Sequence, residues 1–258
     1  MSPALPGFTR SAFHPHDHAL ITPESRTWST VSAPGWANAT AAHVASPALG
    51  ARFTMALVSL GAGGVVGPPH APDVDRVVYV LGGEVDVGVA GGGARRTLRC
   101  DGFVFAPARG PAVSLASASG ASLLLYEAAA PPGHAGDAAS TRAPIVAPSA
   151  SALRTVDPGG GETFTLRKLL PPAAAAFNVH VMDFEPGEYL VTKEAHHNEH
   201  GLLLVEGRGV YRLGEKYYAV TAGDAIWMAP YTLQWYGALG TGRSRYVIYK
   251  NTNEAGAW

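Results

Sequence analysis

The chain alternates short apolar runs with turn-forming residues along most of its 258 residues. The runs are rich in Val, Leu, Ile, Tyr and Phe, and the 31 glycines and 20 prolines are spread between them rather than gathered in one tract. Brief apolar runs bounded by turn residues are typical of an all-β barrel or sandwich built from many short strands. The predicted strands are residues 55–60, 76–89, 103–106, 113–116, 121–127, 164–170, 177–184, 201–206, 210–213, 225–229 and 245–250.

The predicted strands fall into two halves with the same plan. Residues 128–143, AAAPPGHAGDAASTRA, separate the halves and have the composition of a linker. When Gly82-Gly83 is placed over Glu206-Gly207, Pro107 comes almost into register with Pro230. We interpret this correspondence as an internal duplication that gives two β-barrels in one chain. The predicted units are an N-terminal arm over residues 1–42, a first barrel over 43–128, a linker with a leading strand over 129–160 and a second barrel over 161–258.

Composition narrows the classes of partner. The net charge is −1 and no long basic run occurs, which argues against nucleic acid and against an anionic membrane surface. No apolar stretch reaches the roughly 18 residues that a membrane span needs. The single cysteine, Cys100, excludes an internal disulfide framework and a multi-cysteine zinc site. Residues 1–10 lack the pattern of a secretory signal, so we expect a chain that is not exported. With nucleic acid and membranes disfavoured, a small molecule is the expected partner.

The N-terminal arm is proline-rich and is expected to be irregular. It holds His14, His16 and His18 in the segment FHPHDHALITPESR. Three histidines at a period of two could bind a metal, but Pro15 weakens a regular strand there. A surface or interface segment is the preferred interpretation of this arm.

Residues 186–211, PGEYLVTKEAHHNEHGLLLVEGRGVY, contain the strongest candidate for chemistry. Glu194, His196 and His200 have the same parity, so an extended segment would place all three side chains on one face. A carboxylate and two imidazoles on one face of a strand make a metal site plausible. Their spacing, with six residues between His200 and Gly207, resembles the first metal motif of the cupin family. The usual order His, His, Glu is changed here to Glu, His, His.

Two other interpretations of these histidines were weighed. His196 and His200 are four residues apart, as on the helix of a zinc protease, but HHNEH lacks the glutamate that directly follows the first histidine of that motif. A surface histidine cluster without metal is the other alternative. His197 has the opposite parity and is expected to point away.

A fourth ligand is expected from a later strand. The segment AGDAIWMAPYTLQWYGAL resembles the second cupin motif, with Gln234 where that motif carries histidine. Oxygens from Glu194 and Gln234 together with two imidazoles suit Mn²⁺, although Fe²⁺, Ni²⁺ or Zn²⁺ would be tolerated. The alternative is that Gln234 is a surface amide.

The first barrel serves as an internal control for the metal hypothesis. The positions that align with the four predicted ligands hold only one residue able to bind a metal. They are His70, Pro72, Arg76 and Pro111. The first barrel is therefore expected to be metal-free and to serve packing and assembly.

The segment RSRYVIYKN is predicted to form a wall of the same cavity. Tyr246, Ile248 and Lys250 share one face of the strand. A lysine inside a barrel needs an anionic partner, which a substrate carboxylate would supply, whereas at a strand end it could simply be solvated. Tyr211 and His180 are further candidates for pocket lining, although core packing explains Tyr211 equally well.

Several segments together resemble one family of bicupins. FNVHVMDFEPGEYL, KEAHHNEHGLLLVEGRGVYRLG, VTAGDAIWMAPYTLQWYGALG, RSRYVIYKN and the N-terminal PGFTRSAFHPHDHALITPESR are similar to the (S)-ureidoglycine aminohydrolase family of purine (allantoin) catabolism. The resemblance covers both ends and most of the second barrel, while the middle of the first barrel is diverged. It implies two tandem cupin barrels of the jelly-roll (double-stranded β-helix) type.

The resemblance also implies a site and a reaction. Glu194, His196, His200 and Gln234 correspond to the family's Mn²⁺ ligands, and Glu194, Gln234, Tyr246 and Lys250 to its substrate contacts. The family converts (S)-ureidoglycine and water to (S)-ureidoglycolate and ammonia. Glu194, or a water on the metal, is the expected catalytic group. A homo-oligomer is implied as well, in the cytoplasm for a bacterial chain and in the endoplasmic reticulum for a processed plant-type chain.

Two other functions remain as alternatives. Another metal-dependent cupin enzyme, an isomerase or an oxygenase, would commonly carry three histidines and a glutamate, so Gln234 and the leading Glu194 count against it. A non-catalytic bicupin that binds or stores small molecules has no need of four converging ligands in one half. Metal analysis and an assay for ammonia release distinguish the three.

Overall fold

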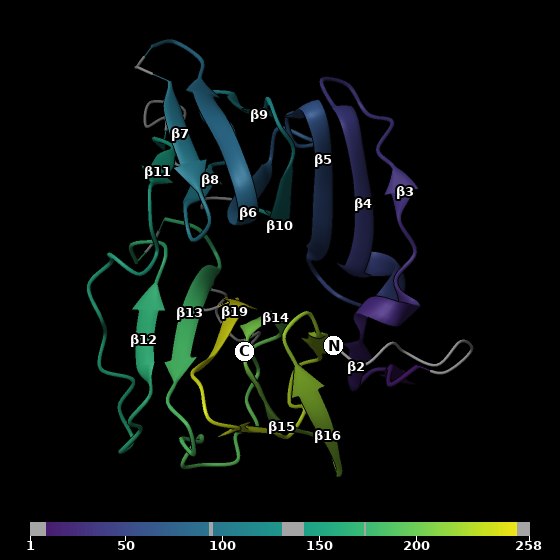
Figure 1. The fold of residues 1–258 in the computed structure, drawn as a ribbon, viewed down its shortest axis with the longest axis vertical. Helices are drawn as coiled ribbons and strands as arrows, with labels where there is room; N and C mark the ends of the chain where they lie inside the picture. Colours follow the sequence, from purple (N-terminus) through teal and green to yellow (C-terminus); the bar gives the residue numbers. More distant parts are fainter. Residues whose placement is uncertain (1–8, 93–94, 131–141, 173, 252–258) are drawn as a thin grey trace.

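The computed structural model describes residues 9–92, 95–130, 142–172 and 174–251. In this part of the chain the fold is all-β, with 19 strands and two short 3₁₀-helices, η1 (Pro23–Ser25) and η2 (Pro47–Leu49). Figure 1 shows two stacked barrels, with β3 to β11 above and β12 to β16, β19 and the early strand β2 below. The predicted all-β fold with two barrels is confirmed. No helix of the described residues is long and apolar enough to cross a membrane.

The N-terminal barrel is one nine-stranded sheet folded over on itself. The sheet bends over along its long strand β6. Residues 74–83 of this strand pair with β10, while residues 84–87 pair with β7. Inward-facing side chains such as Val78, Val80 and Leu123 form its own core. The strands of this barrel are β3 (Ser29–Thr30), β4 (Ala37–Ala45), β5 (Thr54–Val66), β6 (Val74–Val89), β7 (Arg96–Arg99), β8 (Phe103–Ala106), β9 (Val113–Ser117), β10 (Ala121–Ala129) and β11 (Ile145–Ala147).

The C-terminal barrel consists of a seven-stranded sheet, in the order β1-β2-β17-β14-β19-β13-β12, and a three-stranded sheet, β16-β15-β18. Leu202, Phe184 and Tyr236 belong to the core between these two sheets. The strands are β1 (Ala12–His14), β2 (His18–Ile21), β12 (Thr165–Lys168), β13 (Asn178–Phe184), β14 (His200–Glu206), β15 (Arg208–Leu213), β16 (Lys216–Thr221), β17 (Ala225–Met228), β18 (Gln234–Leu239) and β19 (Ser244–Lys250).

A third apolar core joins the two barrels. Strand β19 shows how alternation builds it, because Tyr246 and Ile248 belong to the core of the C-terminal barrel while Val247 and Tyr249 belong to the core between the barrels. Phe53 of the N-terminal barrel stacks on Tyr249 with ring centroids 4.0 Å apart. The two barrels are therefore packed as one body through the outer face of the strands that carry the candidate site.

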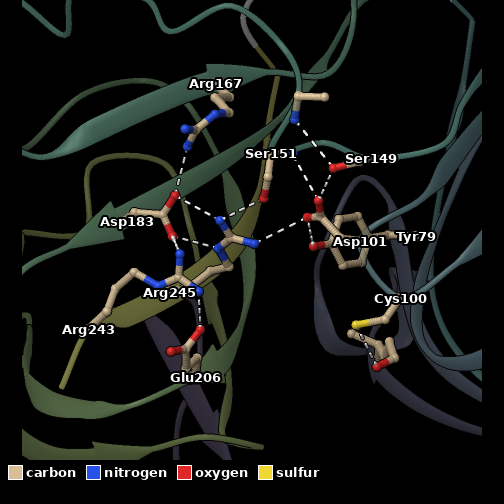
Figure 2. Close-up of polar contacts among 12 residues, drawn as sticks. Tyr79, Cys100, Asp101, Ser149, Ser151, Arg167, Asp183, Glu206, Arg243 and Arg245 are labelled. Atoms are coloured by element: carbon tan, nitrogen blue, oxygen red, sulfur yellow. Dashed lines mark hydrogen bonds and ion pairs between the residues drawn. The ribbon is translucent and has the colours of Figure 1, made fainter.

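A buried polar network also ties the barrels together (Figure 2). The Arg245 guanidinium donates to both oxygens of Asp183 on the neighbouring strand, with distances of 2.5 and 2.9 Å. Another of its nitrogens lies 3.1 Å from Asp101, which follows β7 of the N-terminal barrel. Tyr79 and Ser149 donate to the same aspartate. Arg245 thus bridges a carboxylate of each barrel.

Each barrel receives an edge strand from the segment that precedes the other. Strand β2 pairs with β17 of the C-terminal barrel, and β11 pairs with β8 of the N-terminal barrel. These exchanged edges fit the interpretation of an internal duplication, because β8 and β17 hold equivalent places in the two halves.

The expectation of an irregular N-terminal arm over residues 1–42 is wrong for much of residues 12–42. Pro15 lies in the turn of a hairpin in which His14 pairs with His18, and His16 takes a left-handed φ of 64°. The three histidines therefore do not line one strand face. Strand β4 is also part of the barrel sheet. Residues 1–8, and residues 131–141 of the predicted linker, lie outside the described residues.

Candidate functional site

The loop before β14 carries two of the candidate ligands. The expectation of an extended strand through this segment is wrong for residues 195–199, because β14 begins only at His200. Glu194 is instead held by a bridge to Gln234, in which each backbone amide donates to the other residue's carbonyl at 2.9 and 2.8 Å. The Tyr231 amide donates to the His196 carbonyl at 2.7 Å. Backbone bonds to one later segment therefore place this loop over the barrel.

The four predicted ligand side chains converge on one point. The Nε2 atom of His196 lies 3.4 Å from Nε2 of His200 and 3.1 Å from Nε2 of Gln234. It lies 3.6 Å from Oε2 of Glu194. The interpretation of HHNEH as a zinc-protease helix is wrong, because this segment is loop and strand. The His197 ring contacts Asn198 at 3.4 Å, outside the group.

The surroundings keep the buried histidine of this group neutral and oriented. The Tyr249 carbonyl lies 3.1 Å from Nδ1 of His200, which turns Nε2 towards the other ligands. Burial lowers the pKa of His200 well below its usual value, so its lone pair is free for a metal. The contact with His196 lowers the pKa of Glu194 against the opposing effect of burial, and the charge of Lys250 lowers it further.

These side chains fit a divalent cation with small adjustments. Two ligand atoms about 2.1 Å from one cation and at right angles to each other are about 3 Å apart. The contacts of 3.1 and 3.4 Å come close to that spacing. No three His, Cys, Asp or Glu side chains of the described chain are grouped closely enough to hold a metal ion as they stand, and the Glu194 carboxylate, 43% exposed, lies 3.6 Å from His196. A turn of that carboxylate and of the Gln234 amide would complete two oxygen and two imidazole ligands.

A cavity of about 240 Å³ opens beside this group. Glu194, His200 and Gln234 line it on one side, and Tyr246 and Lys250 line it from β19. Lys250 is directly opposite His200 in the register of β14 and β19. Burial lowers the pKa of Lys250, while the charge of Glu194 opposes this. The cavity thus combines the candidate ligands with a cation that could bind an acidic group.

Both remaining candidates also line this cavity. Tyr211 is 1% exposed and lies against Tyr236 and Tyr246, so it belongs at once to the core and to the cavity wall. His180 is 7% exposed, and its Nε2 atom is buried without a hydrogen-bond partner. Burial, with the nearby charges of Lys168 and Lys250, lowers the pKa of His180 to about 3.

Two charged lining residues, Lys168 and Glu162, were missed by the sequence analysis. Lys168 lies opposite His180 on β12, and its shared parity with Phe164 and Leu166 in the same run could have placed it on the cavity face. Glu162, whose carboxylate accepts from the Val191 amide at 2.9 Å, comes from a glycine-rich turn that carries no such signal.

The equivalent place in the N-terminal barrel holds an ion pair. Arg76 and Glu127 face each other on β6 and β10, as His200 and Lys250 do on β14 and β19. The Arg76 Nε atom donates to Glu127 at 2.7 Å, and Arg76 is only 4% exposed. A buried guanidinium at this position repels a divalent cation, which supports the prediction that this barrel is metal-free.

Comparison with known proteins first gives the class. A model of the cupin domain matches residues 180–249. The structure of the E. coli protein Ylba superposes with a TM-score of 0.79 at 24% identity, covering 97% of each chain. A structure of Bacillus subtilis oxalate decarboxylase, studied for its Mn(II) centres, superposes with a TM-score of 0.66 at 12% identity, covering 92% of this chain and 78% of that one. The doubled barrel is therefore a bicupin.

Sequence relatives then give the family. The protein named (S)-ureidoglycine aminohydrolase in Arabidopsis thaliana is 42% identical over 96% of this chain and 80% of its own length. The rice protein named "Probable (S)-ureidoglycine aminohydrolase" is 42% identical over 96% of this chain and 77% of its own length. The chain belongs to the (S)-ureidoglycine aminohydrolase family, a family of hydrolytic enzymes.

Proposed function

We propose that this enzyme uses Mn²⁺ to convert (S)-ureidoglycine and water to (S)-ureidoglycolate and ammonia in the breakdown of purine-derived ureides. The observation that carries the proposal is the convergence of Glu194, Gln234 and two histidines beside a cavity that Lys250, the sheet neighbour of His200, also lines. The names and identity of the plant relatives support the reaction.

The donor set supports manganese. Two oxygens and two imidazole nitrogens form a mixed site without thiolate, which suits Mn²⁺ better than the softer metals. The likeness to a decarboxylase studied for its Mn(II) centres adds support from the fold alone. A divalent cation held here would supply a Lewis acid beside the reacting carbon.

The chain's own side chains account for binding and orientation. The reacting carbon of ureidoglycine bears an amine, a ureido nitrogen and a carboxylate. Lys250 and the Tyr246 hydroxyl hold the carboxylate, while the ligand group of Glu194 and Gln234 faces the amine. Anchors at fixed positions bind one enantiomer and expose one face of the carbon to water.

Glu194 transfers the proton from the attacking water to the leaving amine. Its carboxylate stays ionised because the contact with His196 lowers its pKa, so it can accept a proton from the attacking water as the carbon–oxygen bond forms. The same proton goes to the amine as the carbon–nitrogen bond breaks, and ammonia leaves. One water is consumed and one ammonia is released.

The test is ammonia release from ureidoglycine made in situ by an allantoate-hydrolysing enzyme. Metal-stripped enzyme should lose activity, and Mn²⁺ should restore it better than Zn²⁺. Bound metal without ammonia release would instead support another metal-dependent cupin enzyme. Neither metal nor ammonia release would support a binding bicupin.

A further inference from the structure

His180 is a buried polar side chain of the cavity wall that the proposed reaction leaves without a role. It is 7% exposed and lines the cavity, and its Nε2 atom is buried without a hydrogen-bond partner among the described residues. A buried imidazole nitrogen that makes no hydrogen bond costs free energy, on the order of 1–3 kcal/mol. A ligand in the cavity that supplies the missing partner would remove that cost.

Sheet register fixes where His180 stands relative to the other groups. The order of neighbouring strands is β14, β19, β13 and β12. His200 is opposite Lys250, His180 is opposite Ile248, and Lys168 is opposite His180. Since all of these residues line the cavity, His200 and Lys250 lie side by side on its wall, and His180 is the diagonal neighbour of Lys250 on the next strand, two residues along.

The dimensions of an α-ureido acid match this row. Neighbouring strands are about 4.8 Å apart. With covalent bonds of about 1.3–1.5 Å, the carboxylate carbon and the terminal ureido nitrogen of an extended molecule are about 5 Å apart. Diagonal neighbours such as Lys250 and His180 are about 7–8 Å apart, and the hydrogen bonds to the two side chains span the difference. A carboxylate on Lys250 therefore places the ureido end either towards His200 or towards His180. The side of His200 is taken by the amine in the proposed reaction.

The hydrogen-bonding character of His180 also matches the ureido end. A neutral imidazole has one N–H donor and one acceptor nitrogen. The terminal ureido group offers a carbonyl acceptor and an NH₂ donor, so it can bond the unpartnered Nε2 atom whether that nitrogen donates or accepts. A carboxylate offers acceptors alone and is better bound by lysine. The charges of Lys168 and Lys250, together with burial, keep the imidazole neutral.

From this geometry we propose that His180 is the specificity-determining residue that recognises the terminal carbamoyl group of the substrate. The proposal rests on the proposed function for the direction in which the substrate lies. It assigns His180 to binding, and it leaves the proton chemistry to Glu194.

The test compares two unreactive probes on the manganese-loaded enzyme by isothermal titration calorimetry. N-carbamoylglycine carries the carboxylate and the ureido group, and N-acetylglycine replaces the terminal NH₂ by methyl. The wild-type enzyme should bind N-carbamoylglycine roughly tenfold tighter, as expected for one hydrogen bond to a buried partner. In His180→Phe the two probes should bind about equally well, while the affinity for N-acetylglycine stays within about twofold of the wild-type value. His180→Asn, which keeps a donor and an acceptor, should retain part of the preference.

Metal content and melting temperature of both variants serve as controls for the fold. A His180→Phe variant that keeps the full preference, or that loses affinity equally for both probes, would overturn the assignment. The outcome is separable from the proposed reaction. If the wild-type enzyme releases no ammonia but His180→Phe loses the preference for N-carbamoylglycine, the proposed reaction is refuted and the binding role is supported. If the wild-type enzyme releases ammonia but His180→Phe keeps the preference, the reaction is supported and the binding role is refuted.

Discussion

The two barrels place different side chains at the same point of the same fold. In the N-terminal barrel Arg76 and Glu127 lie opposite each other on β6 and β10 and neutralise each other. In the C-terminal barrel the equivalent pair is His200 and Lys250. Both members of this pair lack an acidic partner at ion-pair distance in the described structure. Arg76 and Glu127 pair with each other inside their barrel. His200 and Lys250 remain available to bind a metal ion and an acidic ligand.

The pair in the N-terminal barrel is also enclosed by its neighbours. The Arg76 guanidinium lies over the Trp36 ring, 5.6 Å from its centroid, and donates to the Gly67 carbonyl. Every group of the ion pair thus has a partner within the barrel. The comparison indicates that a duplicated barrel can lose its ligands and keep its fold if an internal ion pair takes their place.

The N-terminal barrel still serves the site, because it packs on the back of the ligand strand. The Tyr126 hydroxyl lies 3.1 Å from the carbonyls of Gly201 and Val247, on the two strands that carry His200 and Lys250. A Cβ atom added at Gly201 would lie 2.6 Å from the Phe53 ring. The backbone of β14 therefore sits directly on the first barrel, which positions His200.

The largest effect is expected when the pair of the C-terminal barrel is broken. His200→Ala removes a metal ligand, so it should lower kcat/KM by more than about 100-fold, since even the loss of a residue that only supports a ligand costs 10–100-fold. Bound metal should fall in parallel, as measured by elemental analysis. Full metal content in this variant would refute the ligand assignment.

Lys250→Met should separate substrate binding from metal binding. Loss of a charged hydrogen bond to the carboxylate should raise KM by roughly 10- to 100-fold. Metal content should stay near that of the wild type, because Lys250 is not a ligand. Lys168→Met is the matched control, with a change in KM below about threefold expected for a more exposed lysine. Loss of metal in Lys250→Met would contradict the separation of roles.

The equivalent substitution in the N-terminal barrel should change the stability of the protein but not its catalytic activity. Arg76→Met leaves the Glu127 carboxylate unpaired, which should cost about 3 kcal/mol in the free energy of unfolding. Denaturant unfolding measures this loss, and KM and metal content should not change. The double variant Arg76→Met with Glu127→Leu should recover most of the stability. If KM rises in the single variant as much as in Lys250→Met, the two barrels do not divide the roles as described.

The smallest effect concerns the N-terminal hairpin that extends the C-terminal barrel. His18 is buried between Asp17 and Tyr218, each 2.9 Å from a ring nitrogen. Burial lowers the pKa of His18 from its ordinary 6.5, although the hydrogen bond with Asp17 opposes this. Below pH 6.5 the unfolded chain takes up a proton sooner than the folded chain does, so stability should fall. The melting temperature of the wild type should therefore drop more between pH 7.5 and 5.5 than that of His18→Gln, and equal drops would count against a role for His18.

Alternation along buried strands was readable from the sequence, and the tertiary course of the loops was not. Strand β19 was predicted with Tyr246, Ile248 and Lys250 on one face, and all three line the cavity. The placement of Glu194, His196 and His200 on one face assumed an extended segment, but residues 195–199 form a loop whose position is set by backbone bonds to residues 231–234, far along the chain. Local parity cannot reveal such a partner.

Exposure explains the strands that were missed. In β16 at the edge of the three-stranded sheet, Val220 is the one buried residue, so no apolar run marks it. The hairpin of β1 and β2 was obscured by Pro15, which the structure places in the turn. Gln234 was found because the resemblance to a cupin motif predicted a ligand at that position, although an isolated glutamine carries no such signal.

Anomalous diffraction at the manganese absorption edge, from crystals of the Mn²⁺-loaded protein, tests the metal site most directly. The account predicts one strong peak per chain, within bonding distance of Glu194, His196, His200 and Gln234. A peak beside Arg76 in the N-terminal barrel, or no peak at either position, would contradict it.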